Sequence, residues 1–524
     1  MKNKMLLTSA PSREGFLSRA LLPLAAAVCI WLGFAHPLPL LPDALPPLAL
    51  LAPVMLALMG LRAGHAGQAF RRGWLAAWGG HLAALYWLCL PIHQVGGLPW
   101  WLAIPCAAFV AACLSSAGGL FAWAAYLLRR RTPLVLALAL GLCWYLLEWG
   151  YAVTAGFPWL PLSGALAAWP LLIQPADVLG GYLLGGLWVF LLLLLFMAPH
   201  GRRYPLLSLL LMLACLGYGY WRLGREPLDP LPEGSDSFAV LFAEGNIDQN
   251  QKWLPAFQRG TVQTYLRLTE QMLAEHPGEH PLIVWPETAL PFNLMAANPH
   301  TPRIRELAAR AQSPLLTGAP GFEGSREAMR VYNRAYLIGP DGSLAGYYDK
   351  EHLVPFGEYV PDWLQWNFLE GLLQQVGVYT PGTRLAPLSS SGLELGMLIC
   401  YEGIFPWLAQ QRVRDGANVL VDISNDGWFG LSPAGLQHLR LTAVRAVEQN
   451  RWILRGTNTG ISAIIDARGR IVLRGGQFEE AAHWGRARVL TETTPYHRIA
   501  RWLPAGAALL LLSLIFFGPV RRNV

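Results

Sequence analysis

Eight apolar runs constrain this chain more than any other feature of its sequence. A helix needs roughly 20 apolar residues to cross ~30 Å of hydrocarbon, and the runs of about that length lie near 18–35, 44–61, 73–92, 99–128, 133–151, 178–198, 205–221 and 503–519. Charged residues make up only 14% of the 524 residues, against roughly 25% in soluble proteins. We therefore predict a polytopic α-helical membrane domain with eight transmembrane helices. The same observations exclude a wholly soluble enzyme, a disordered chain and a coiled coil.

The basic residues indicate how these helices are oriented. Clusters of Lys and Arg occupy every second connection, whereas the connections 36–43, 93–98 and 152–177 contain neither residue. By the positive-inside rule, the N-terminus and the basic clusters are cytoplasmic. Seven crossings then place residues 226–502 outside. Cleavage of the first run as a signal peptide would leave that placement unchanged. Because the basic residues follow topology, the net charge of +7 does not indicate a nucleic-acid partner.

Residues 226–502 have a different pattern. Short apolar runs typical of strands alternate there with helical patterns at 256–275, 302–312 and 434–450. This alternation predicts an α/β domain in which helices cover a sheet. The sequence thus predicts three parts, which are a membrane domain at 1–225, an α/β domain at 226–502, and a last helix with a cytoplasmic tail at 503–524.

Three predicted strands of this domain are followed by residues that can carry chemistry. Glu287 comes after LIVWP, Lys350 comes after GYYD, and Cys400 ends GMLIC. Catalytic groups in α/β domains tend to lie beyond the carboxyl ends of strands. A thiol, a carboxylate and an ammonium are the parts of a base-activated nucleophile, and the ammonium favours the reactive thiolate. Taken singly, each residue has an ordinary explanation in packing, helix capping or solvation, so the prediction rests on all three together.

The motifs around these residues resemble those of bacterial apolipoprotein N-acyltransferases, a family of the nitrilase superfamily. WPET around Glu287, YDKEHLVPFGEYVP around Lys350 and LICYE around Cys400 match the Glu-Lys-Cys triad of that superfamily. Further matching motifs are EGNIDQNQKW at 244–253, VYNRAYL at 331–337, SNDGWFG at 424–430 and RGTNTG at 455–460. The resemblance covers essentially the whole chain, including seven apolar runs before the α/β domain and one after it.

The resemblance implies an αββα sandwich inserted before the last helix. It also implies that Glu287 is the general base, Lys350 the oxyanion stabiliser and Cys400 the nucleophile. Supporting roles fall on Glu358, Tyr401, Glu402, Trp253, Asn333 and Trp428. For the two tryptophans core packing is the alternative, and for the asparagine a strand-end hydrogen bond. No metal or cofactor is expected, since the sequence contains no HExxH, paired CxxC or GxxxxGK motif.

The function that the resemblance implies is a ping-pong acyl transfer. The donor is a membrane phospholipid, the acceptor is the α-amine of a diacylglyceryl apolipoprotein, and a thioester on Cys400 links the two steps. The expected setting is the bacterial inner membrane, with a monomer whose catalytic domain lies in the periplasm. Two alternatives stay open, namely a membrane-anchored amidase or hydrolase of the nitrilase type and a transporter or scaffold with an inactive domain.

A segment after Lys350 predicts contact with the lipid surface. Residues 361–375 bring together the large apolar side chains of Trp363, Trp366 and Phe368. Amphipathic stretches rich in Trp, Phe and Leu favour the headgroup boundary of a bilayer. We expect this segment to be a lid that dips into the membrane beside Cys400. Packing of the same residues on the domain core is the alternative.

Overall fold

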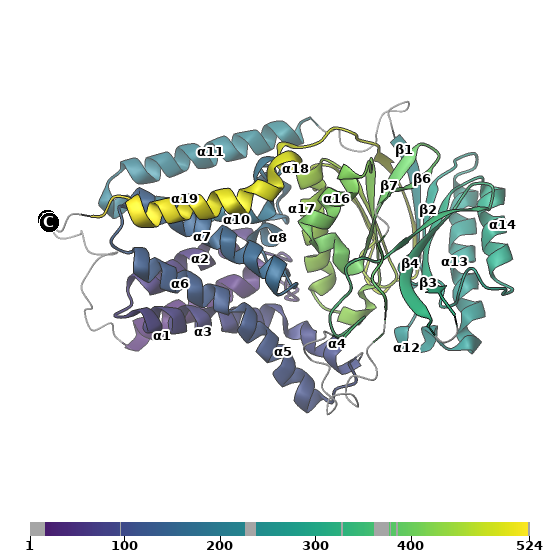
Figure 1. The fold of residues 1–524 in the computed structure, drawn as a ribbon, viewed down its shortest axis with the longest axis horizontal. Helices are drawn as coiled ribbons and strands as arrows, with labels where there is room; N and C mark the ends of the chain where they lie inside the picture. Colours follow the sequence, from purple (N-terminus) through teal and green to yellow (C-terminus); the bar gives the residue numbers. More distant parts are fainter. Residues whose placement is uncertain are drawn as a thin grey trace.

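The chain builds a bundle of apolar helices at one end and a sandwich of two sheets at the other (Figure 1). The computed structural model describes residues 16–94, 96–225, 237–325, 328–360, 377, 379–383 and 386–521. The order of elements is helices first, then the sandwich, then one last helix.

The bundle begins with helices joined by short connections. Its elements are α1 (Phe16–Gly33), α2 (Pro46–Leu61), α3 (Ala66–Ala84), η1 (Tyr86–Leu88), α4 (Cys89–Gln94), α5 (Trp100–Leu114), α6 (Ser116–Leu128), α7 (Pro133–Thr154), α8 (Leu162–Leu166), α9 (Pro170–Ile173), α10 (Ala176–Leu195), η2 (Ala198–His200) and α11 (Arg203–Leu223). After the sandwich, α18 (Pro495–Ile499), η7 (Ala500–Trp502) and α19 (Leu503–Phe517) return to the bundle.

Of the eight predicted spans, five are helices long and apolar enough to cross a membrane, within the part of the chain that the structure describes. They are Trp100–Leu128, Pro133–Thr154, Ala176–Leu195, Arg203–Leu223 and Pro495–Phe517. The third predicted run is a pair of helices bent by 62°, which makes a sixth span if the pair is one. The first two runs contain shorter apolar stretches of helix, Leu21–Gly33 within α1 and Pro46–Leu61 in α2. In α2, Pro46 and Pro47 occupy the first turn, where proline fits because the backbone N–H that it lacks would have no partner within the helix.

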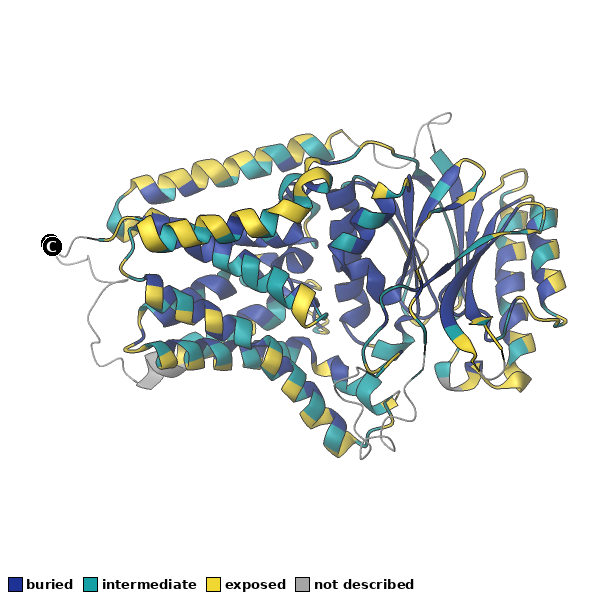
Figure 2. Cartoon of the chain, in the orientation of Figure 1, coloured by how far each residue is buried: buried dark blue, intermediate teal, exposed yellow. Residues whose placement is uncertain are grey.

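The outer surface of the bundle is apolar. Along α11 and α19, exposed residues alternate with partly buried ones on the outside of the molecule (Figure 2). Leu210 and Leu213 of α11 and Leu509 and Phe517 of α19 are all exposed. A soluble helix would place charged side chains at such positions, whereas a helix in lipid can present leucine and phenylalanine. The exposed faces of these two helices are therefore suited to hydrocarbon.

Each sheet of the sandwich has six strands. The first has the order β12-β1-β2-β3-β4-β5, and the second has the order β11-β10-β9-β8-β7-β6. The strands are β1 (Ser237–Glu244), β2 (Leu282–Val284), β3 (Leu315–Glu323), β4 (Arg330–Ile338), β5 (Leu344–Asp349), β6 (Leu388–Ser390), β7 (Leu393–Ile399), β8 (Val419–Ser424), β9 (Ile453–Thr457), β10 (Ala463–Ile465), β11 (Ile471–Arg474) and β12 (Ala481–Arg488). The predicted α/β fold is confirmed, with two sheets.

Helices cover both outer faces of the sandwich. The inner faces pack against each other through residues such as Val240, Val284, Met397 and Val421. The helices α13 (Pro255–Glu275) and α14 (Thr301–Ala311) cover the first sheet. The helices α16 (Pro406–Arg414) and α17 (Ala434–Gln449) cover the second sheet (Figure 1). This is the αββα arrangement that the resemblance implies. Strands buried on both faces explain why their sequences are continuous apolar runs.

The helix α17 joins the two ends of the molecule. All 16 of its residues are buried, because it lies between the second sheet and the helices α8 and α10 (Figure 1). Both Val444 and Val447 belong to the same apolar cluster as the bundle core. The second sheet, which carries Cys400, is therefore the sheet nearer to the bundle.

Basic residues gather at the opposite end of the bundle. The backbone N–H of Arg521 donates to the carbonyl oxygen of Arg130 over 2.8 Å, and its Nε donates to the carbonyl oxygen of Arg131 over 2.9 Å. The C-terminal end of the chain lies there, far from the sheets (Figure 1). Two basic clusters from distant parts of the sequence thus share one end of the molecule, and the sandwich occupies the other.

Candidate active site

The three predicted catalytic residues come from the ends of three strands and are all buried. Glu287 closely follows β2, and Lys350 directly follows β5, both in the first sheet. Cys400 directly follows β7 in the second sheet and begins the turn η5 (Cys400–Ile404). The exposed fractions of these residues are 5%, 1% and 7%. Since two sheets contribute, the site forms only when the sandwich closes.

Lys350 is held between two carboxylates. Its Nζ donates to Oε1 of Glu358 over 2.9 Å and lies 3.6 Å from Oε1 of Glu287. Burial by itself would lower the pKa of Lys350, but the charges of Glu358 and Glu287 outweigh it and hold that pKa above its ordinary value. Lys350 is therefore a permanent cation at the centre of the site.

Asn333 of β4 fixes the two carboxylates relative to each other. Its Nδ2 donates to Oε1 of Glu287 over 2.7 Å and to Oε1 of Glu358 over 2.8 Å. The other oxygen of Glu358 accepts from the backbone N–H of Val354 over 2.8 Å. The structure thus brings Asn333 and Glu358, which the family motifs single out, into direct contact with the triad.

Glu287 has the properties of a proton acceptor. Burial raises the pKa of its carboxyl group, Lys350 opposes the rise, and Glu358 adds to it. Among the described residues, no group forms a hydrogen bond to its Oε2 atom. A buried carboxylate with a raised pKa and an unoccupied oxygen is suited to general base and acid work near neutral pH.

Cys400 is held in an unusual backbone conformation. Its φ angle is +55°, a left-handed value that is uncommon for a residue with a side chain and that concentrates at functional sites. Burial raises the pKa of its thiol well above the ordinary value, Glu287 adds to the rise, and Lys350 opposes it. Lys350 lowers the pKa of the Cys400 thiol, as expected, but burial raises that pKa by more than Lys350 lowers it. The free site therefore contains a thiol, which must lose its proton as it attacks.

Glu402 ties the two sheets together at the site. Its carboxylate accepts from Tyr348 Oη over 2.9 and 3.0 Å and from the backbone N–H groups of Glu351, His352 and Ile399 over 2.7, 2.9 and 2.8 Å. Tyr348 and the two residues after Lys350 belong to the first sheet and its loop, whereas Ile399 precedes the nucleophile. One fully buried carboxylate thus fixes Lys350 and Cys400 relative to each other.

Removing this carboxylate should destabilise the whole protein. Glu402→Ala leaves four donor groups at the site without this acceptor, so we expect a loss of roughly 3–5 kcal/mol in the free energy of unfolding. Glu402→Gln keeps one carbonyl oxygen as an acceptor and should lose about half as much. Thermal unfolding in detergent measures both variants. An alanine variant as stable as the wild type would show that the carboxylate does not fix the site.

Tyr401 links the nucleophile to the membrane helices. Its hydroxyl group donates to the carbonyl oxygen of Gly156. Its ring stacks with those of Phe157 and Trp159, with centroids 6.3 and 6.4 Å apart. Both aromatic residues belong to the connection between α7 and α8, in which the sequence analysis recognised no site residue. The recognised motifs all lie in the α/β domain. The connection between α7 and α8 contains no charged side chain that would indicate a site.

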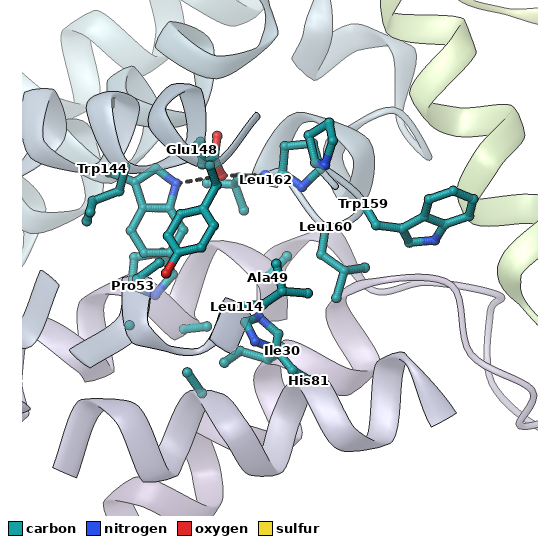
Figure 3. Close-up of a pocket in the computed structure, with 18 of the residues that line it drawn as sticks. Ile30, Ala49, Pro53, His81, Leu114, Trp144, Glu148, Trp159, Leu160 and Leu162 are labelled. Atoms are coloured by element: carbon teal, nitrogen blue, oxygen red, sulfur yellow. Dashed lines mark hydrogen bonds between the residues drawn. The ribbon is translucent and has the colours of Figure 1, made fainter. Parts of the chain in front are cut away.

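A cavity of about 110 Å³ opens on the bundle side of these two rings. It is lined almost entirely by apolar side chains of the bundle, among them Trp159 (Figure 3). Phe157 also lines it. At its edge the carboxylate of Glu148 accepts from Trp144 Nε1 over 2.8 Å and from the backbone N–H of Leu162 over 2.7 Å (Figure 3). An apolar space in the bundle is thus separated from the residue next to Cys400 by stacked aromatic rings.

The remaining predicted residues lie outside this contact network or outside the described structure. Trp253 is 46% exposed, just after α12 (Gln249–Lys252). Trp428 is partly buried in η6 (Asp426–Phe429), which packs against α4 of the bundle. The predicted lid lies outside the described residues, together with its Trp363, Trp366 and Phe368.

A buried polar cluster behind Cys400 escaped the sequence analysis. His438 Nε2 donates to the carbonyl oxygen of Cys400 over 3.1 Å, and its Nδ1 accepts from Arg455 over 3.0 Å. Arg455 also donates to Asp426 over 2.9 and 3.0 Å. The motifs SNDGWFG and RGTNTG carry Asp426 and Arg455, but the letters alone do not tell which motif residues face the nucleophile. Within the described ranges, no group of three or more His, Cys, Asp or Glu side chains has an arrangement that would hold a metal ion.

Comparison with known proteins agrees with both parts of the chain. The family described as Apolipoprotein N-acyltransferase N-terminal domain matches residues 26–195, and the family described as Carbon-nitrogen hydrolase matches residues 249–502. The apolipoprotein N-acyltransferase of Geobacter metallireducens is 36% identical over 466 residues, which cover 86% of this chain and 87% of that protein. The chain belongs to the apolipoprotein N-acyltransferase family.

Other members of the apolipoprotein N-acyltransferase family match along nearly the same length. The protein of Azotobacter vinelandii is 34% identical over 508 residues, covering 92% of each chain. That of Pseudomonas putida is 34% identical over 501 residues, covering 91% of this chain and 94% of its own. The family assignment made from motifs is confirmed, and with it the prediction of an acyltransferase of the nitrilase superfamily that acts in lipoprotein N-acylation.

Proposed function

We propose that the chain transfers an acyl chain from a membrane phospholipid to the α-amine of the S-diacylglyceryl-cysteine that begins an apolipoprotein. The observation that carries this proposal is the buried set of Glu287, Lys350 and Cys400, coupled through Tyr401 to an apolar cavity among membrane helices. A site of this kind suits a donor whose acyl chains lie in hydrocarbon.

In the first step the sulfur of Cys400 attacks the ester carbonyl of the phospholipid. Glu287 takes the thiol proton through its open Oε2, and Lys350, with the backbone N–H of Tyr401, stabilises the oxyanion of the tetrahedral intermediate. The C–O bond then breaks, and Glu287 returns the proton to the leaving oxygen. The products are a thioester on Cys400 and a lysophospholipid.

In the second step the α-amine of the apolipoprotein attacks the thioester carbonyl. Glu287 removes a proton from the nitrogen as the C–N bond forms, and the same donors stabilise the oxyanion. When the C–S bond breaks, the proton passes to the sulfur and restores the thiol. The products are an amide on the lipoprotein and the free enzyme.

The proposed setting is the bacterial inner membrane, where the chain acts as a monomer with eight crossings. Residues 1–225 form the membrane domain, 226–502 form the periplasmic catalytic domain, and 503–524 form the last crossing and its cytoplasmic tail. Both proposed substrates are confined to a bilayer, so a catalytic domain tethered at both ends meets them at a raised effective concentration. A hydrolase of small soluble amides would gain nothing from this arrangement.

Transfer and hydrolysis can be told apart by their products. The full-length protein is placed in vesicles of phosphatidylethanolamine whose acyl chains carry an isotope label, together with a synthetic S-diacylglyceryl-cysteine peptide. The proposed function predicts labelled amide on the peptide and an equal amount of lysophospholipid. Release of labelled fatty acid with no amide would instead support the membrane-anchored hydrolase.

The proposed topology predicts opposite reporter activities at two points of the chain. Alkaline phosphatase, which is active only outside the cytoplasm, should be active when fused after Arg225 and inactive when fused after Arg131. The reason is that basic clusters are retained in the cytoplasm. Activity measured in whole cells tests both fusions, and an inactive reporter after Arg225 would overturn the periplasmic placement.

A further inference from the structure

Lysine is rare in this chain, and its positions are informative. Lys and Arg together number 40, but only four are lysines, namely Lys2, Lys4, Lys252 and Lys350. Arginine supplies nearly all the cations of the loops and surfaces. The two lysines beyond the N-terminal segment are both buried, with exposed fractions of 0% for Lys252 and 1% for Lys350. A lysine presents a compact charge that can lose its proton, which an arginine cannot do.

The contacts of Lys252 lead directly to the proposed base. The Nζ atom of Lys252 donates to Oγ1 of Thr288 over 2.8 Å, and Thr288 is the residue after Glu287. The φ angle of Thr288 is +45°, which is a strained value for a β-branched residue. Strand β3 lies so close to this turn that a Cβ atom on Gly318 would come within 2.3 Å of the Thr288 nitrogen. Lys252 therefore contacts the residue next to Glu287, in a turn that is packed closely against β3.

Lys252 adds a second cation to the pair of carboxylates formed by Glu287 and Glu358. Glu287 and Glu358 are two buried carboxylates, and Lys350 is nearer to Glu358 than to Glu287, at 2.9 against 3.6 Å. With one cation for two carboxylates, the buried site would carry a net negative charge, which is costly away from water. Lys252 supplies a second cation on the side of Glu287.

Two family motifs cooperate to place this lysine. The segment EGNIDQNQKW delivers Lys252 inward at the end of α12, while its neighbour Trp253 stays at the surface. Asn458, from the motif RGTNTG of the second sheet, donates to the carbonyl oxygen of Ile247 over 2.8 Å, and its Oδ1 accepts from the N–H of Ile247 over 3.0 Å. The segment before α12 is thus anchored to the opposite sheet.

We propose that Lys252 is a positioning residue for the reaction, which holds the Glu287 turn through Thr288 and keeps the Glu287 carboxylate ionised while Lys350 is paired with Glu358. The inference rests on the proposed role of Glu287 as the base. Burial lowers the pKa of Lys252 to about 7, and the Glu287 carboxylate opposes the fall. Below that pH, Lys252 carries its charge and favours the ionised form of Glu287.

The pH dependence of thioester formation tests this role. The charged and titratable groups that act on Glu287 are Lys252 on α12, Lys350 after β5, Glu358, Tyr379 and Cys400. Lys252→Met keeps the length of the side chain and removes its charge, so the pKa of Glu287 rises further. Acylation needs the ionised carboxylate of Glu287. The acid limb of the profile of acylation rate against pH should therefore move to higher pH by about one unit.

The experiment uses the full-length protein in vesicles of phosphatidylethanolamine, with the mass of the Cys400 peptide followed over time at a series of pH values. Thr288→Val should move the acid limb in the same direction, since the ammonium loses its acceptor, and the matched Thr288→Ser should not move it. If Lys252→Met fails to fold, the acid limbs of Thr288→Val and Thr288→Ser test the inference. Equal limbs in these two variants would overturn it. A Lys252→Met variant that is slower at every pH with an unmoved limb would overturn the inference and leave the proposed function intact. Absence of thioester in the wild type would instead refute the proposed function.

Discussion

Cys400→Ala should abolish acyl transfer while the protein stays folded. We expect the rate to fall by a factor on the order of 10⁴ or more, because the proposed thioester forms on the sulfur atom of Cys400. The loss of one sulfur atom leaves a small cavity, so stability should change by about 1 kcal/mol. Transfer of labelled acyl chains to the peptide in vesicles measures the first effect, and thermal unfolding measures the second.

Cys400→Ser serves as the matched control for this variant. It keeps a hydroxyl nucleophile of similar size, but a hydroxyl group is a much weaker acid than a thiol and the proposed base is a carboxylate, so this variant should be almost as inactive as the alanine variant. Appreciable amide formation by Cys400→Ala, in protein free of wild type, would refute the covalent mechanism.

Glu287→Gln should stop the first half-reaction. The side chain keeps an oxygen that can accept from Asn333, and the pair of Lys350 and Glu358 stays in place, so the fold should survive. The lost proton acceptor should slow thioester formation by a factor on the order of 10²–10⁴. In the wild type this rate should rise with pH through the raised pKa of Glu287, and that limb should vanish in the variant.

Glu358→Gln is the comparison for Glu287→Gln, because both carboxylates contact Lys350 and Asn333. If Glu358 has a supporting role and is not the group that removes the proton, Glu358→Gln should still accumulate thioester. Its rate of amide formation should nevertheless be low. Equal thioester levels in wild type and Glu287→Gln, measured by the mass of the Cys400 peptide, would show that another group is the base.

The three predicted catalytic residues, Glu287, Lys350 and Cys400, were predictable because each of them follows the end of a strand. The apolar runs before Glu287 and Cys400 are continuous, since these strands are buried on both faces, and the polar residue that follows each run stands out. The helices of the bundle were predictable because a helix that crosses hydrocarbon must be a long apolar segment. Patterns of this kind predict features that depend on residues close together in the sequence.

Contacts between distant segments were not predictable in this way. The strand β12 pairs with β1 although some 240 residues separate them, and no local pattern specifies a partner so far away. The bend of 62° between α3 and the helices after it interrupts an apolar run whose letters give no sign of a break. Tyr401 meets Phe157 and Trp159 only because α17 holds the second sheet against the bundle.

Lys252 is the clearest example of a residue whose role could not be predicted from the sequence. A single lysine in a polar segment is ordinarily a solvated surface group, and nothing in its neighbours QNQ and W shows that it is buried. Lys252 reaches the residue next to Glu287 because Asn458, after β9 of the second sheet, anchors the segment that leads into α12. The function of such a residue follows from its surroundings and not from its sequence context.

The covalent intermediate is the central claim, and one measurement tests it directly. The full-length protein is incubated with phosphatidylethanolamine vesicles and no acceptor, then digested, and the mass of the peptide that contains Cys400 is determined. We predict an added mass equal to one acyl group of the donor, which is lost on treatment with hydroxylamine and is absent from Cys400→Ala. An unmodified peptide in protein that nonetheless acylates the acceptor would contradict the account.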